Sequence, residues 1–154
     1  MADFDIRRDD VTEAEVVALI RLHLAGMHAQ SPPESVHALG LDALRKPDVT
    51  FWTVWQRDAL LGCGALKELD RTHGEIKSMR TAPQHLRKGV AARLLAHILD
   101  EAARRSYRRV SLETGSTEGF DAALRLYERF GFERCGPFGD YKLDPFSVFM
   151  TKVL

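Results

Sequence analysis

The chain has 154 residues, of which 45% are hydrophobic, and its 22 basic side chains balance its 22 acidic ones. This length and composition predict one compact domain over residues 1–154 and exclude a disordered protein. The neutral charge argues against a nucleic-acid partner, and no apolar run is long enough to cross a bilayer. The first residues also lack the pattern of a signal peptide, so we expect a cytoplasmic protein with no membrane partner.

The N-terminal third predicts one strand and two helical segments. Phe4 to Arg8 is strand-like, and Thr12-Glu13-Ala14-Glu15 has the form of a capping box. We expect Thr12 to cap a helix that runs to about Met27. A second short helical region is predicted between Ser35 and Leu44, after the break at Ser31-Pro32-Pro33.

The remaining elements predict a mixed sheet with helices. Three consecutive strands form a meander, followed by a helix, a strand, a second helix that ends at Gly131, and two short closing strands. Their expected ranges are Thr50 to Trp55, Leu60 to Leu66, Gly74 to Thr81, a helix from about Arg87, Val110 to Thr114, Phe120 to Phe130, Phe132 to Cys135 and Ser147 to Val153. The strand, helix, strand order over residues 75–114 favours one parallel pairing.

The segment from Glu75 to Leu95 is the most informative part of the chain. It predicts a strand that passes through a tight turn at Gly89 into a helix, with no acidic residue between Glu75 and Asp100. The basic residues there are Lys77, Arg80, Arg87, Lys88 and Arg93. Free N–H groups at a helix start attract anions, so the turn is a candidate phosphate site. The spacing matches neither the nucleoside triphosphatase loop nor the dinucleotide fingerprint.

Two motifs in this chain are typical of one family. The first is Met79-Arg80-Thr81-Ala82-Pro83 with Leu86-Arg87-Lys88-Gly89-Val90-Ala91, and the second is Leu126-Tyr127-Glu128-Arg129-Phe130-Gly131-Phe132. Together they resemble the GNAT superfamily of acetyl-CoA-dependent N-acetyltransferases. The C-terminal stretch also resembles a largely uncharacterised bacterial subgroup of acetyltransferases. The resemblance covers essentially the whole chain. It implies an α/β (α+β) single-domain fold with a mostly antiparallel sheet of six to seven strands, splayed beside Glu75 to Thr81, and about four helices.

The resemblance also implies where acetyl-CoA binds. Backbone N–H groups of Arg87, Lys88, Gly89, Val90, Ala91 and Ala92 would hold the pyrophosphate, and the backbone of Met79, Arg80 and Thr81 would pair with the pantetheine arm. Leu86 stands where the family has Gln or Arg, and Phe120 stands where many members have Asn. These departures motivate an alternative, an acyl-CoA sensor of the same fold without turnover.

Acetyl transfer to an amine needs a base and an acid. Tyr127 matches the tyrosine that lies near the coenzyme sulfur in the family and is the candidate acid, although its spacing also suits a core tyrosine. Glu75 is the candidate base, on the same strand face as Met79 if side chains alternate. A structural ion pair with Lys77 is the equal alternative, and Glu113, Glu118 or water are further candidates.

Other reactive residues suggest no separate chemistry. The six histidines lack metal-ligand spacing, so no metal is expected. Cys63 and Cys135 are expected to be free thiols, with a disulfide left open, and Trp52 and Trp55 to pack on opposite faces of one strand. The expected acceptor is a small-molecule amine or a peptide. A homodimer is possible, and the sequence does not define the acceptor, the acyl chain or the oligomeric state.

Overall fold

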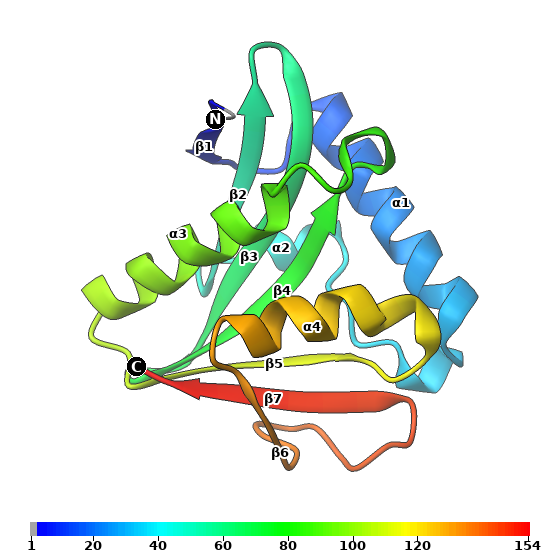
Figure 1. The fold of residues 1–154 in the computed structure, drawn as a ribbon, viewed down its shortest axis with the longest axis vertical. Coiled ribbons are helices and arrows are strands. Elements are labelled where there is room, and N and C mark those ends of the chain that lie inside the picture. The colour runs from blue at the N-terminus through cyan, green and yellow to red at the C-terminus, as the bar shows by residue number, and fades with distance from the viewer. Residues whose placement is uncertain (1–2) are drawn as a thin grey trace.

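A computed structural model describes residues 3–154, in which a seven-stranded sheet has the order β1-β2-β3-β4-β5-β7-β6 (Figure 1). The strands are β1 (Asp5–Arg8), β2 (Val49–Gln56), β3 (Ala59–Asp70), β4 (His73–Thr81), β5 (Arg109–Gly115), β6 (Glu133–Cys135) and β7 (Ser147–Val153). All neighbours pair antiparallel except β4 and β5, which are parallel. The predicted mixed sheet, with its meander and its single parallel pairing, is confirmed.

In the part of the chain that the structure describes, four α-helices cover the two faces of the sheet (Figure 1). They are α1 (Ala14–Gln30), α2 (Leu41–Leu44), α3 (Val90–Arg104) and α4 (Asp121–Arg129). Helices α1 and α2 share one apolar core with Phe51 and Trp55, and α3 and α4 share the other with Trp52. The expected opposite placement of the two tryptophans is therefore confirmed, because side chains alternate along β2.

The sheet opens between β4 and β5. Their parallel pairing begins at His73 and Arg109 and ends at Ile76 and Leu112, although both strands continue beyond those residues. Figure 1 shows the two strands diverging, with α4 in front of the gap. The end of β4 therefore has one edge bonded to β3 and one edge free of strand partners.

Two details of the N-terminal third differ from the prediction. Helix α1 begins after Glu13, without any side-chain cap bond, so Thr12 does not cap it, and it extends to Gln30 instead of Met27. The hydroxyl of Thr12 bonds to Asp10 instead. Only Leu41–Leu44 is α-helical in the second predicted region, after a 3-10 turn at Pro33–Ser35. Within the described residues, every helix is too short or too polar to span a membrane.

Candidate active site

The turn before α3 presents free backbone donors, as its sequence predicts. Gly89 has φ +82°, and Arg87 also lies in the left-handed region with φ +63°. The first bond of the helix runs from the N–H of Arg93 to the carbonyl of Gly89, so the N–H groups of Val90 to Ala92 have no acceptor within the helix. This array and the positive helix end can hold an anion.

A cleft of about 790 Å³ runs from this turn along α4. Its lining includes Gly89 to Ala92, and from α4 it includes Arg125 and Arg129. These two arginines were not predicted from the sequence. The available signal was that they stand four residues apart, on one face of the helix that ends before Gly131. Lys88 does not line the cleft, and its ammonium group lies 3.0 Å from Nδ1 of His85.

A bulge in β4 reverses the side-chain alternation at the strand's open end. Lys77 pairs with Ala65 but Arg80 pairs with Cys63, so β4 has one extra residue there, and Ser78 has φ +57°. As a result Met79 packs towards α3. Its sulfur lies next to Gly64 on the same side as Leu94 of α3, because a Cβ added to Gly64 would meet both side chains. The prediction that Glu75 and Met79 share a face is therefore wrong, because the bulge breaks the alternation on which it rests.

Tyr127 lies where the cleft meets a second, smaller cavity. This inner cavity has a volume of about 180 Å³ and shares Met79, Arg80 and Tyr127 with the cleft. Tyr127 is 6% exposed, and burial raises the pKa of its phenol. The phenol therefore stays protonated at neutral pH, as a proton donor must.

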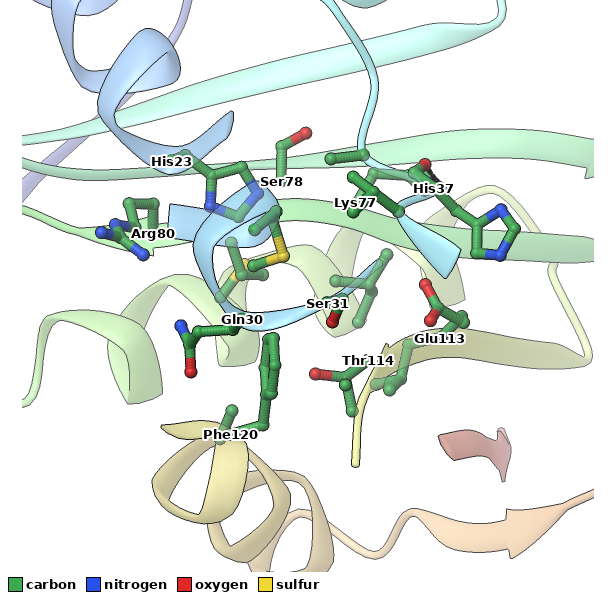
Figure 2. Close-up of a pocket in the computed structure, with 18 of the residues that line it drawn as sticks. His23, Gln30, Ser31, His37, Lys77, Ser78, Arg80, Glu113, Thr114 and Phe120 are labelled. Carbon is green, nitrogen blue, oxygen red and sulfur yellow. Dashed lines mark hydrogen bonds between the residues drawn. The ribbon is translucent and has the colours of Figure 1, made fainter. Parts of the chain in front are cut away.

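The inner cavity is lined by polar groups from opposite sides. His23, Ser78 and Arg80 lie on one side and Glu113 and Thr114 on another, with Phe120 pointing in between them (Figure 2). Burial raises the pKa of the Glu113 carboxyl. This carboxylate is the candidate base that lines the cavity directly.

Glu75 lies in a separate buried cluster. Its carboxylate pairs with Lys77 at 3.3 Å and accepts a hydrogen bond from the hydroxyl of Tyr141, and it is 3% exposed. Lys77 also donates to the carbonyl of His37 and to Tyr141. Glu75 lines a third cavity, beneath the loop that contains Tyr141, and does not line the inner cavity. Tyr141 was missed because nothing local connects it to Glu75.

The remaining candidate residues do not form part of the cleft or the inner cavity. Cys63 is buried, and burial raises the pKa of its thiol to about 12, so it is a poor nucleophile. Both cysteines are free thiols. Glu118 is exposed and lines neither the cleft nor the inner cavity. Between residues 3 and 154, no group of three or more His, Cys, Asp or Glu side chains is placed to hold a metal ion.

The cleft, the helix start and the buried tyrosine can be compared with known proteins. The model of the acetyltransferase (GNAT) family matches residues 15–132. The chain belongs to this family. It is 60% identical to the uncharacterized N-acetyltransferase YsnE of Bacillus subtilis over 97% of this chain and 99% of that protein. It is 54% identical to YedL of Escherichia coli, also named an uncharacterized N-acetyltransferase, over 98% and 95% of the two chains.

Solved structures agree with this assignment. A protein of Klebsiella pneumoniae described as an acyl-CoA N-acyltransferase is 30% identical and superimposes with a TM-score of 0.79, covering 98% of this chain and 97% of that one. A GNAT acetyltransferase of Elizabethkingia anophelis, solved with acetyl-CoA bound, has a TM-score of 0.71 at 17% identity over 98% of both chains. The predicted fold class and family are confirmed, and the protein is an acetyltransferase whose donor is the acetyl-CoA of its family.

Proposed function

We propose that this acetyltransferase moves the acetyl group of acetyl-CoA to a primary amine of a small molecule or peptide by direct attack. The observation that carries the proposal is the junction of two cavities at Met79 and Tyr127. One cavity leads to a helix start with free N–H groups, and the other contains a carboxylate. A donor and an acceptor can therefore meet at a buried phenol.

The donor's two ends fit two features of the cleft. The N–H groups near residues 87–92 and the side chains of Arg125 and Arg129 are placed for the pyrophosphate. The free edge of β4 at Met79 to Thr81 offers backbone donors and acceptors to the amides of the pantetheine arm, in the manner of an added strand. The thioester then lies beside Tyr127.

Glu113, instead of Glu75, is the base that we propose. Its carboxylate lines the inner cavity, and its raised pKa makes it a better proton acceptor than an ordinary carboxylate. Glu75 is already bonded to Lys77 and Tyr141, which suits a supporting role in positioning Lys77. We therefore prefer Glu113 to Glu75 as the base because only Glu113 lines the inner cavity.

The reaction then proceeds without a covalent enzyme intermediate. Glu113 takes a proton from the acceptor's ammonium group, and the neutral nitrogen attacks the thioester carbon. When the C–S bond breaks, Tyr127 gives its proton to the departing sulfur, and the new amide nitrogen loses a proton that restores the phenol. The proton that Glu113 took from the ammonium group is released to solvent before the next turnover. Burial disfavours a lasting phenolate, so Tyr127 must regain its proton within each turnover.

Substitution of the acid and the base tests this assignment. Tyr127→Phe and Glu113→Gln are each expected to lower kcat by about 10²- to 10⁴-fold at saturating acetyl-CoA, because each removes a proton-transfer group. CoA thiol release during reaction with a panel of amines measures the rate. Tyr107→Phe, which alters a tyrosine bonded to Glu68 on another part of the fold, is the control with unchanged kcat.

Two results would contradict parts of the proposal. Unchanged kcat in Tyr127→Phe removes that residue from the mechanism, and a large loss in Glu75→Gln with none in Glu113→Gln returns the base to Glu75. Binding of acetyl-CoA without thiol release for any amine would instead favour the sensor.

A further inference from the structure

The inner cavity has an uncompensated positive charge on its α1 side. Arg80 lines the cavity and forms no ion pair within residues 3–154, whereas Lys77 is offset by Glu75. Gly26 in α1 leaves room for its guanidinium group, because a Cβ there would lie 3.2 Å from both terminal nitrogens of Arg80. A guanidinium group can bind a planar anion such as a carboxylate through two parallel hydrogen bonds.

Two buried polar atoms beside Arg80 have no partner. His23 is 4% exposed and Ser78 is 8% exposed, yet neither Nδ1 of His23 nor Oγ of Ser78 forms a hydrogen bond within the described residues. Both residues line the inner cavity. A buried polar atom without a partner costs about 1–3 kcal/mol, so these two atoms are available to hydrogen-bond a polar ligand in the cavity.

The electrostatic surroundings favour a ligand that is an anion on this side. Burial, with Arg80 and Lys77 nearby, lowers the pKa of His23 to about 4, so its imidazole is neutral at physiological pH. In the Nδ1–H tautomer it can donate one hydrogen bond without adding charge. One negative charge would therefore satisfy Arg80, His23 and Ser78 together.

Glu113 on the opposite side completes the chemistry of the ligand. Figure 2 shows it across the cavity from His23 and Arg80, where its carboxylate can accept from an ammonium group. A volume of about 180 Å³ is below the roughly 300–1,000 Å³ of pockets for larger ligands. The cavity thus fits a small molecule with one anionic and one cationic end.

We propose that the acetyl acceptor is a small amino acid, whose carboxylate is held by Arg80, His23 and Ser78 while its amino group faces Glu113 and the thioester. This proposal rests on the proposed function and narrows its acceptor to a carboxylate-bearing amine. One carboxylate matches the single free guanidinium in charge and in planar shape, which a phosphate dianion does not.

The test compares amino acids with their carboxamides, which keep the amine but lose the charge. The probes are the common α-amino acids, β-alanine and γ-aminobutyrate, each with its amide, together with 2-aminoethyl phosphate. For the preferred acid we expect a kcat/KM about 10- to 150-fold above that of its amide, the range of a hydrogen-bonded charge. Arg80→Gln should remove this preference by lowering the rate with the acid while changing the rate with the amide less than about threefold.

The controls separate the acceptor from the donor. Arg21→Gln, which removes an exposed charge elsewhere on α1, should keep the preference, and His23→Leu should weaken it without changing the KM for acetyl-CoA. An equal loss with acid and amide in Arg80→Gln would assign this side chain to the donor and overturn the proposal. Equal rates with acids and amides, or a higher rate with the phosphate, would also overturn it.

Binding to the complex with CoA distinguishes this proposal from the proposed function. If calorimetry shows that an amino acid binds, that this binding depends on Arg80 and that no acetyl transfer follows, the proposed function is contradicted and the carboxylate site is supported. Rapid acetylation of uncharged amines, with no binding of any amino acid, would remove the carboxylate site and leave the acetyltransferase.

Discussion

At the scale of single residues, His23 shows how a site can reduce stability. It is almost fully buried in α1 and neutral, and its pKa is lowered to about 4 by burial first and then by the charges of Arg80 and Lys77. The unfolded chain accepts a proton near the ordinary histidine pKa of about 6.5, whereas the folded chain resists it. Folding is therefore penalised as the pH falls from 6.5 to 4.

This linkage predicts that replacement of His23 makes the stability of the protein depend less on pH. His23→Gln should lose about 3 kcal/mol less unfolding free energy than the wild type between pH 6.5 and pH 4, since each pKa unit corresponds to about 1.4 kcal/mol. Urea denaturation across this range measures the difference. His28→Gln, in an exposed position of the same helix, should follow the wild-type curve. Parallel curves for His23→Gln and wild type would contradict the assignment.

At the scale of elements, the bulge in β4 places the functional side chains of one strand on both faces of the sheet. Met79 faces α3, whereas Arg80 and Lys77 face the α1 side. Without the extra residue at Ser78, Met79 would face α1 instead of packing towards α3. The bulge therefore lets one strand line the inner cavity with its charged groups and place an apolar residue at the junction with the cleft.

The turn before α3 has left-handed backbone at Arg87 and Gly89. Gly89→Ala should destabilise the protein by about 1–2 kcal/mol, because φ +82° is unfavourable for a side chain while the new Cβ would meet nothing within 4 Å. Urea denaturation of the ligand-free protein measures this backbone cost. Gly136→Ala is the matched control, since its Cβ also meets nothing within 4 Å and its φ is not positive, and it should change stability by less than about 0.5 kcal/mol. Equal effects of the two substitutions would contradict the explanation.

At the scale of the whole molecule, the sheet is open at one end between β4 and β5. Pairing between β4 and β5 ends at Ile76, and beyond it the cleft separates the start of α3 from α4. A donor bound there would contact both halves at once. Because only the folded state offers this cleft, binding should raise global stability by mass action.

Acetyl-CoA at about 100 times its dissociation constant is therefore expected to raise the unfolding free energy by about 2.7 kcal/mol. Urea denaturation with and without the ligand measures the change, and hydrogen exchange should slow at the N–H groups of Val90 to Ala92. Acetate alone, which lacks the pyrophosphate, is the control. If saturating acetyl-CoA does not stabilise the protein, both the proposed transfer reaction and the acyl-CoA sensor are contradicted.

Much of this molecule could be predicted because its patterns are local. The order of strands and helices follows from apolar periodicity, Gly89 marks the anion turn, and Tyr127 with Gly131 marks the second family motif. The buried face of α3, from Val90 to Ala102, follows the helical period of its apolar residues. Each of these features depends on residues a few positions apart.

The composition and motifs of the sequence by themselves determined the fold class and the family, because both depend on local patterns, and they predicted the residues that we propose for the two ends of the coenzyme. Only the tertiary structure decided which acidic residue lines the inner cavity. One extra residue at Ser78 changes the faces of β4, and Tyr141, which bonds to Glu75, lies 66 positions away. The position of Arg80 close to the α1 residues Gly26 and His23 likewise depends on how a helix crosses a sheet. A one-dimensional pattern cannot specify such contacts, because strand register and packing across the sheet are set by the whole core.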